Sequence, residues 1–195
     1  MDFQILYALN SIHSEVLDKI MVAITYLGEK GIFWIGLSII LMFFKKTRKC
    51  GLFMLIAMAI GVILGNGILK NVVARQRPCW IDESIRLLVA NPKDFSFPSG
   101  HTLASFEAAI TILCFNKKWG IVAIITAIMV GISRLYLFVH FPTDVLAGAI
   151  LGTIIALLVY FFGNKIEDKI KAKKGNDVSN TETEKIGEIK DEECV

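Results

Sequence analysis

The sequence has few of the residues that carry metal or redox chemistry, with four cysteines and three histidines among 195 residues. The cysteines are widely scattered, no C-x-x-C pair occurs, and no histidine stands near them at metal-ligand spacing. This pattern supports neither a zinc site nor a disulfide framework. The formal net charge is only +3, and the basic residues cluster beside apolar runs instead of forming a stripe along which a phosphate backbone could lie. Nucleic-acid binding is therefore not expected.

Apolar residues, in contrast, are abundant, because 54% of the chain is hydrophobic, which exceeds what a soluble globular chain needs to fill a core. A membrane-spanning helix needs roughly 20 mainly apolar residues, or fewer where its flanks reach the interface. None of the apolar stretches alternates as a lipid-facing strand does, and charged residues, Pro or Gly separate each from the next. The sequence therefore predicts an all-α integral membrane protein with five transmembrane helices, over residues 31–44, 51–69, 99–115, 119–138 and 142–162.

The two ends of the chain differ from this central part. Residues 16–27 are apolar, but the stretch is short and Asp18 and Lys19 interrupt it. This pattern favours an N-terminal amphipathic helix in the membrane interface, while a tilted sixth span stays open. The C-terminal residues are polar and charged, with too few apolar side chains to pack, which predicts a disordered cytoplasmic tail. The expected divisions are the N-terminal helix in residues 1–30, the transmembrane domain in residues 31–163 and the tail in residues 164–195.

Basic residues fall in three clusters beside the apolar stretches. The clusters are Lys45, Lys46, Arg48 and Lys49, then Lys117 and Lys118, and finally Lys165, Lys169, Lys171, Lys173 and Lys174. If the five helices alternate in direction, all three clusters lie on one side of the membrane. Positively charged loops stay on the cytoplasmic side. The end of the second span, the start of the third, and the turn between the fourth and fifth are therefore expected to face outward.

Three polar segments, distant in the sequence, lie at these outward span ends. They read KNVVARQRP from Lys70, PSGH from Pro98, and SRLYLFVHFPTD from Ser133. Lys70 and Arg77 are seven residues apart, and they share a helical face if the helix continues to Gln76. The topology thus predicts that the three segments converge at one membrane depth.

Each polar residue has an ordinary explanation when it is taken alone. Lys and Arg at span ends reach toward headgroups, Ser99 suits a helix N-cap, and Asp144 in a first helical turn complements the helix dipole. Together these explanations are weaker, because cations on the translocated side are disfavoured unless an anion holds them there. Two histidines, several fixed cations and a helix N-terminus with free N–H groups are what a phosphoryl group requires. We therefore predict a phosphate-binding site.

The three segments also match the motifs K-x6-R-P, P-S-G-H and S-R-x5-H-x3-D, in this order and with correct internal spacings. On these residues the chain resembles the type 2 phosphatidic acid phosphatase superfamily over residues 51–162. Among its members the chain is most similar to small bacterial membrane phosphatases that act on lipid phosphates and diphosphates, including undecaprenyl diphosphate. The resemblance implies a multi-pass enzyme of the bacterial plasma membrane with its active site on the extracytoplasmic side.

The resemblance also implies a role for each matching residue. His140 attacks phosphorus and forms a phosphohistidine that water hydrolyses, while Asp144 accepts the proton of the other ring nitrogen. His101 protonates the leaving oxygen as the general acid. The non-bridging oxygens are held, without a metal or another cofactor, by Lys70, Arg77, Arg134, the hydroxyl of Ser99 and the backbone N–H of Gly100.

Two charged residues near the motifs stay outside the predicted site. Arg75 lies two residues from Arg77 and would point elsewhere on a helix, so a headgroup or loop contact is favoured over catalysis. Glu107 lies inside the third span, where an ionisable group usually faces the bundle or a wet cavity. It either supports the site or pairs with a polar neighbour. The polar loop between the first two motifs is expected to cover the site or to meet the lipid headgroup.

The function expected from the resemblance is metal-independent hydrolysis of a lipid phosphate or diphosphate, with undecaprenyl diphosphate preferred. Phosphatidic acid and phosphatidylglycerol phosphate are alternative substrates, and a lipid phosphotransferase would use the same phosphohistidine with another acceptor. An anion transporter, a different class, would line its path with intramembrane charges. The transporter is disfavoured, because the charges gather at one face and no inverted repeat is evident.

Overall fold

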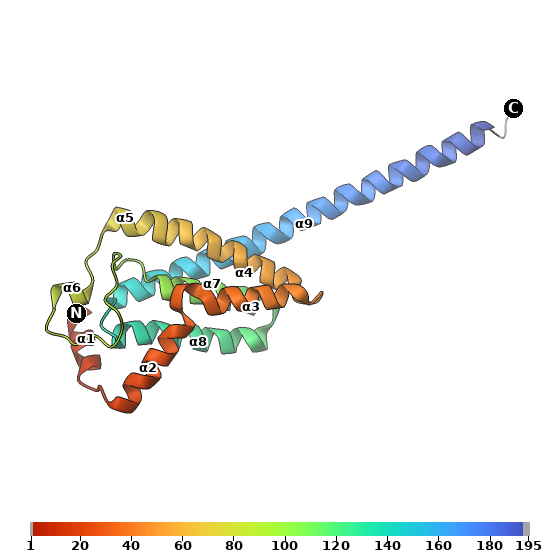
Figure 1. The fold of residues 1–195 in the computed structure, drawn as a ribbon. Coiled ribbons are helices and arrows are strands. Elements are labelled where there is room, and N and C mark those ends of the chain that lie inside the picture. The colour runs from red at the N-terminus through yellow and green to blue at the C-terminus, as the bar shows by residue number, and fades with distance from the viewer. Residues whose placement is uncertain (1, 193–195) are drawn as a thin grey trace. The chain divides into compact units, whose positions relative to one another are not determined.

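The structure, a computed structural model, describes residues 2–192, apart from the side chains of residue 30 and of residues 174–192. Within this range every regular element is a helix (Figure 1), which confirms the all-α class. The chain divides into two compact units, Met1–Val159 and Tyr160–Val195, and the first contains all the predicted site residues. The elements are α1 (Asp2–Asn10), α2 (Glu15–Leu27), η1 (Glu29–Gly31), α3 (Ile32–Phe43), α4 (Arg48–Gly61), η2 (Val62–Leu69), α5 (Lys70–Val73), α6 (Pro78–Ile81), α7 (Gly100–Phe115), α8 (Lys117–Tyr136) and α9 (Pro142–Glu192).

Two short helices precede the first predicted span. Ser14 caps α2, because its hydroxyl accepts a hydrogen bond from the Leu17 N–H at 3.4 Å. The buried Leu6 of α1 packs with Phe138 and Phe141, and α2 also contacts α8. A short 3-10 helix, η1, then leads into α3. The N-terminal segment therefore packs against the bundle, and an interfacial location for α2 stays a prediction.

The second predicted span is one helical run that changes type along its length. α4 passes into η2, a π-helix in which the Lys70 N–H bonds to the Gly65 carbonyl five residues earlier. α5 ends where Ala74 has a left-handed conformation with φ 45°, and Arg77 is extended, as residues before proline generally are. The helix therefore does not continue to Gln76, so the condition for a shared face is not met and Lys70 and Arg77 do not share a helical face.

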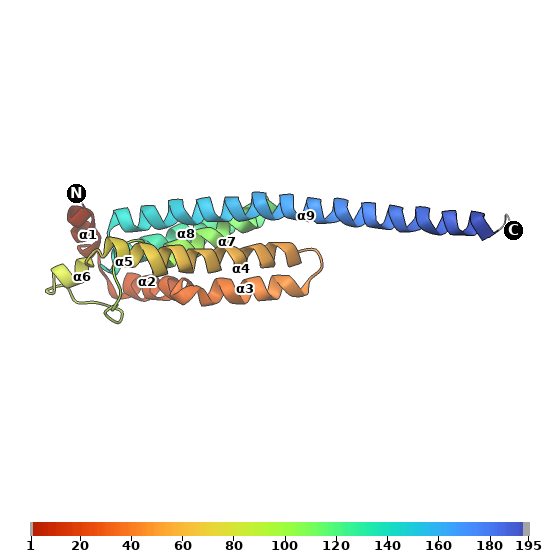
Figure 2. The same cartoon turned by 90° about the horizontal axis from the view of Figure 1, so that it is seen from above.

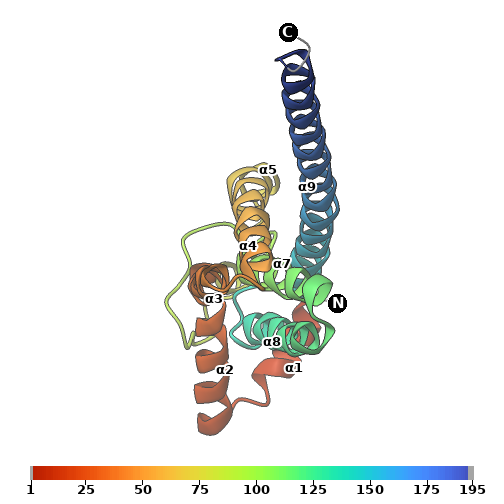
Figure 3. The same ribbon diagram turned by 90° about the vertical axis from the view of Figure 1, so that its right-hand side faces the viewer.

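α7 lies at the centre of the first unit, where it contacts α3, α4 and α8 (Figure 2 and Figure 3). The indole N–H of the buried Trp34 on α3 donates to Ser105 Oγ of α7 at 3.0 Å. The first part of α9 approaches α7 at a glycine, since a Cβ on Gly152 would lie only 2.6 Å from the Leu103 carbonyl oxygen. α7, which begins within the PSGH segment, is thus packed against α3, α4, α8 and the first part of α9.

Among the residues that the structure describes, three helical runs are long and apolar enough to cross a membrane, or four if α2 and α3, which meet at a bend of 49°, form one broken span. The three runs are Arg48–Ile81, Lys117–Tyr136 and Pro142–Lys173, and α7 is a shorter apolar helix. One face of α8 exposes apolar side chains at helical spacing, namely Ile121, Ile125 and Ile128. These features suit a membrane protein, whereas the number of five spans and their sidedness stay predictions.

The last helix extends beyond the end of the predicted fifth span. The sequence predicts a helix to residue 162 and disorder from residue 164, but α9 continues through the second unit to Glu192. An ion pair between Lys171 and Glu167, four residues apart at 2.6 Å, is of the kind that supports an exposed helix. Residues 193–195 of the predicted tail lie outside the described residues, and disorder of the tail stays a prediction.

The close approach of α9 to α7 predicts that Gly152→Ala destabilises the protein. The new Cβ would lie 2.6 Å from the Leu103 carbonyl oxygen and 3.1 Å from Phe106 Cβ, so the two helices must move apart. The expected loss is roughly 1–3 kcal/mol in the free energy of unfolding. Gly36→Ala is the control, because nothing lies within 4 Å of its Cβ and alanine is the better helix former. Thermal unfolding in detergent measures both variants, and an unchanged midpoint for Gly152→Ala would contradict the close approach.

Candidate active site

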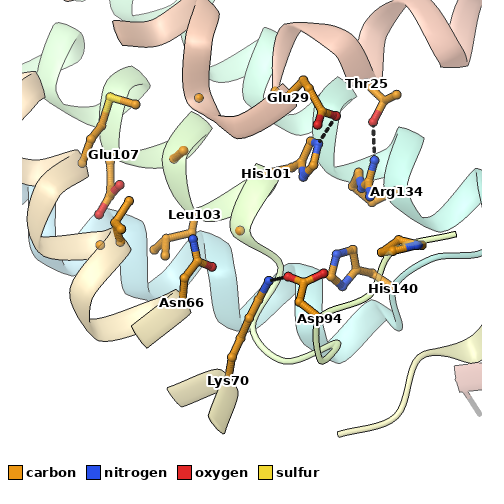
Figure 4. Close-up of a pocket in the computed structure, with 18 of the residues that line it drawn as sticks. Thr25, Glu29, Asn66, Lys70, Asp94, His101, Leu103, Glu107, Arg134 and His140 are labelled. Atoms are coloured by element: carbon orange, nitrogen blue, oxygen red, sulfur yellow. Dashed lines mark hydrogen bonds and ion pairs between the residues drawn. The ribbon is translucent and has the colours of Figure 1, made fainter. Parts of the chain in front are cut away.

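The three predicted motifs meet at one cavity of about 890 Å³ (Figure 4). The predicted site residues that line it are Lys70, Arg77, Gly100, His101, Arg134 and His140. Ser99 and Asp144 are fully buried, and the Ser99 N–H donates to the Asp144 backbone carbonyl at 3.1 Å. The structure therefore brings the segments together as the sequence predicts, and the chemical role of each residue stays a prediction.

His140 lies in the turn between α8 and α9 and is only 1% exposed. Its Nε2 lies 3.1 Å from Nη1 of Arg77. Because a guanidinium only donates hydrogen bonds, Nε2 must accept, and the ring proton is on Nδ1. Burial lowers the pKa of His140 to about 3, with Asp144 opposing this shift and the charge of Arg77 adding to it. The imidazole is thus neutral near pH 7, as a nitrogen nucleophile must be.

The Nδ1 side of His140 faces a buried hydroxyl and a buried carboxylate. Asp144 Oδ2 lies 3.7 Å from Nδ1, which is too long for a direct hydrogen bond. The Ser96 hydroxyl contacts both groups, because its Oγ lies 2.5 Å from Asp144 Oδ2 and 3.4 Å from Nδ1. The same Oδ2 accepts the Phe141 N–H at 2.9 Å. Asp144 is therefore held rigidly next to the ring, and Ser96 is part of its contact with His140.

Arg75 holds the other oxygen of Asp144. Its Nη1 donates to Asp144 Oδ1 at 2.7 Å and to Thr143 Oγ1 at 2.6 Å, and its Nη2 donates to Asp2 Oδ2 at 3.0 Å. The guanidinium also lies over the Phe141 ring, 4.0 Å from its centroid. The sequence favoured a headgroup or loop contact for Arg75, but the structure places it directly behind the predicted catalytic pair.

Two of the predicted phosphate-binding cations share one carboxylate, that of Asp94 in the loop before α7. Lys70 Nζ donates to Asp94 Oδ2, while Arg77 Nη2 donates to Oδ1 at 2.8 Å and Arg77 Nε donates to the Asp94 carbonyl at 2.7 Å. Burial raises the pKa of Asp94, but the hydrogen bond from Lys70 and the charge of Arg77 outweigh it and lower the pKa to about 2. The carboxylate thus binds both cations at once, in the way that two oxygens of one phosphate group would bind them.

The third cation, Arg134, has a free donor. Its Nη1 donates to Thr25 Oγ1 of α2 at 2.7 Å. Its Nε is buried, and among the described residues it has no hydrogen-bond partner. A buried donor without an acceptor is costly and marks a position where a ligand oxygen would be stabilised. Arg134 therefore has an unused hydrogen bond for a ligand in this cavity.

His101 lies in the first turn of α7 and contacts a carboxylate from outside the motifs. Its Nε2 lies 3.3 Å from Glu29 Oε2 of η1. Ser99 occupies the N-cap position of α7, but its hydroxyl does not cap the helix and instead accepts a hydrogen bond from Thr102 Oγ1 at 3.0 Å. Ser99 thus occupies the predicted N-cap position, but its side chain makes no capping hydrogen bond. The first N–H groups of α7 are left without a side-chain cap from this residue.

Four residues of the site were not assigned to it from the sequence, namely Glu29, Arg75, Asp94 and Ser96. A signal existed for two of them, because Asp94 and Ser96 immediately precede PSGH, and an acid beside predicted cations is a natural partner. Glu29 has no local signal, since it lies 72 residues before the histidine that it contacts. Among the side chains that the structure describes, no group of three or more His, Cys, Asp or Glu residues is placed to hold a metal ion.

Comparison with known proteins agrees with the geometry, since the profile of the PAP2 superfamily matches residues 50–168. The chain belongs to the PAP2 superfamily. This membership confirms the resemblance predicted from the three motifs and makes the protein a PAP2 lipid phosphatase. The matched residues include the three motifs and exclude α1, α2 and α3.

Several relatives of this PAP2 protein are phosphatases by name. It is 38% identical over 162 residues to an undecaprenyl-diphosphatase of Sulfolobus acidocaldarius, with 80% of this chain and 78% of the relative covered. It is 31% identical to undecaprenyl-diphosphatase BcrC of Bacillus subtilis, with 84% and 85% covered. The structure of a transmembrane PAP2 type phosphatidylglycerolphosphate phosphatase from Bacillus subtilis superimposes with a TM-score of 0.72 at 34% identity, with 85% of each chain covered.

The position of Asp94 predicts that Asp94→Asn strengthens binding of phosphate anions. The neutral amide no longer competes for Lys70 and Arg77, so KM for a lipid phosphate, or Ki for inorganic phosphate, should fall by up to about fivefold, the scale of a half-exposed ion pair. Because the pKa of Asp94 is about 2, below the ordinary value of about 3.9, the ion pairs persist above that pH and are lost only as the pH falls toward 2. Steady-state kinetics near pH 7 tests this, and a higher KM would show that Asp94 positions the cations instead.

The contacts of Arg75 predict that Arg75→Gln lowers kcat with little change in KM. Asp144 would lose its charged partner and shift relative to His140, and misplacement of a catalytic group by about 1 Å can cost up to a hundredfold in rate. Arg86→Gln, in the exposed part of the loop, is the matched control and should behave as the wild type. A raised KM with an unchanged kcat would instead assign Arg75 to a lipid headgroup.

Proposed function

We propose that this protein hydrolyses lipid phosphates and diphosphates at the extracytoplasmic face of a membrane, through a phosphohistidine on His140 and without a metal ion. The preferred substrate is undecaprenyl diphosphate, which becomes undecaprenyl phosphate. The observation that carries the proposal is the state of His140, a buried neutral imidazole whose unprotonated Nε2 faces a cation and whose Nδ1 faces Ser96 and Asp144.

The first step is the transfer of the phosphoryl group to His140. The substrate phosphate displaces the Asp94 carboxylate from Lys70 and Arg77, and the free Nε donor of Arg134 binds a further oxygen. A phosphate oxygen takes the Nη1 donor of Arg77 from His140, which frees the Nε2 lone pair to attack phosphorus. The bond from phosphorus to the leaving oxygen then breaks. His101 gives its proton to that oxygen. Ser96 and Asp144 stabilise the Nδ1–H of the ring as it becomes positively charged.

The second step is hydrolysis of the phosphohistidine. His101, now without its proton, takes a proton from a water molecule whose oxygen attacks phosphorus, and the bond to Nε2 breaks. Inorganic phosphate leaves and His140 returns to its neutral form. Glu29 contacts the general acid, with its Oε2 3.3 Å from His101 Nε2, and orients the ring for this transfer.

Two observations support the choice of undecaprenyl diphosphate. Two relatives with most of their length matched are named undecaprenyl-diphosphatase. The cavity also extends from the cations to apolar side chains of α3 and α4, among them Ile35, Leu55 and Met58, which suits a lipid chain. An outward-facing site, as the sequence predicts, would reach a carrier lipid on the far leaflet.

The proposal predicts phosphate release from undecaprenyl diphosphate by the purified full-length protein in detergent, with a metal chelator present. His140→Ala should reduce turnover by about a thousandfold or more, because the nucleophile is lost. Rapid quenching with a radiolabelled substrate should trap label on the wild-type protein and not on the variant. Thermal unfolding of both proteins checks that the variant is folded.

Three outcomes would contradict the proposal. Loss of activity on adding the chelator would mean that a metal takes part. Near-normal turnover of His140→Ala would show that another residue is the nucleophile. The lipid panel contains undecaprenyl diphosphate, phosphatidic acid and phosphatidylglycerol phosphate. If the protein releases phosphate from none of them, it is not a lipid phosphatase of the proposed kind.

A further inference from the structure

Glu107 is a buried carboxyl group that the phosphatase mechanism does not use. It is 1% exposed, and neither of its carboxyl oxygens has a hydrogen-bond partner among the described residues. It nevertheless lines the same cavity as the cations, and Figure 4 shows it on the side away from His140. A buried polar group without a partner is costly, so its position in a ligand cavity calls for an explanation.

Glu107 lies about two helical turns along α7 from Gly100, the residue predicted to bind the phosphate through its backbone N–H. Gly100, Leu103, Ala104 and Glu107 all line the cavity, and their spacing places them on one face of the helix. The step of seven positions from Gly100 to Glu107 makes about two turns and rises about 10 Å. Side chains of a helix lean toward its N-terminus, so the carboxyl group lies nearer to the phosphate than the backbone atoms suggest. A substrate that follows this face passes two apolar side chains before it reaches Glu107.

The fold leaves room for this carboxyl group at a glycine. A Cβ on Gly61, the last residue of α4, would lie only 2.0 Å from Glu107 Oε1. Met58, Val62 and Leu103, which line the same cavity, are apolar, and the amide of Asn66, also in the lining, makes no hydrogen bond to Glu107. An isolated carboxyl group in apolar surroundings is more stable as the neutral acid, which has one O–H donor. Glu107 therefore has a hydrogen-bond donor without a partner beside the apolar part of the cavity.

We propose that Glu107 forms a second subsite, in which its carboxyl O–H donates to an acyl carbonyl oxygen of a substrate whose phosphate lies among Lys70, Arg77 and Arg134. This proposal rests on the proposed function and extends it to acylated lipid phosphates. These lipids carry an ester carbonyl separated from the phosphate by part of the glycerol backbone. Polyprenyl chains carry only hydrocarbon at that distance, so they bind without this hydrogen bond. Glu107 is thus a residue that determines specificity between the two classes.

A pair of matched lipids tests the subsite in the wild-type protein. Dioctanoyl phosphatidic acid and its dioctyl ether analogue have the same headgroup and chain length, and they differ only in the two carbonyl oxygens. The full-length protein in detergent should hydrolyse the ester with a kcat/KM roughly fivefold higher, the scale of one hydrogen bond. Equal values for the two lipids would overturn the subsite while leaving the proposed function intact. Hydrolysis of neither lipid, nor of undecaprenyl diphosphate, would overturn both.

Three variants assign the preference to Glu107. In Glu107→Leu the ratio of ester to ether hydrolysis should fall to about one, whereas Glu107→Gln, which keeps an N–H donor, should retain most of the preference. Gly61→Ala leaves Glu107 in the chain but fills the space of its carboxyl group, so it should also lower the ratio. An unchanged ratio in Glu107→Leu overturns the proposal. Equal slowing of both lipids also overturns it, because a purely structural residue would act in this way.

Discussion

Mutual repulsion among Lys70, Arg77 and Arg134 is the physical constraint on which the rest of the site depends. These cations line one partly buried cavity, where like charges repel more strongly than in water. Asp94 neutralises the first two, and Thr25 gives Arg134 a neutral acceptor. The arrangement is stable without a ligand only because a carboxylate from the loop balances the charge. The same balance makes the cavity selective for anions, since only an anion can replace that carboxylate.

A second network of hydrogen bonds orients His140, the proposed nucleophile, through the Nδ1 side of its ring. Arg75 joins Asp144 to Asp2 near the start of the chain, and Ser96 joins Asp144 to His140. The ring is thus oriented by residues from the N-terminus, the loop before α7 and the first turn of α9. Because most of this network is buried, its hydrogen bonds are exchanged with water only when the fold opens. The reactive nitrogen is therefore positioned before any substrate arrives.

Two of the three motif segments could be placed from the sequence because their local geometry is simple. His140 and Asp144 are four residues apart, and PSGH leads into a helix, so their convergence required only the correct order of apolar runs. The partners from other segments could not be found in this way. Glu29 has no local pattern that ties it to His101, because their contact exists only once α7 is packed. The helix end at Ala74 was missed for a similar reason, since alanine favours helix and its left-handed conformation is imposed by the fold.

The π-helix η2 has a consequence for the angular position of everything that follows it. Each residue of an α-helix turns the chain by about 100°, and a π-helical segment accommodates an extra residue within a turn. An α-helical path through the same residues would rotate Lys70 by roughly that angle about the axis of α4 and direct its ammonium group away from the cavity. The π-helical turn around Gly65 therefore rotates the residues after it about the helix axis, relative to their positions on a continuous α-helix. It sets the direction of one charge independently of the direction of the helix that carries it.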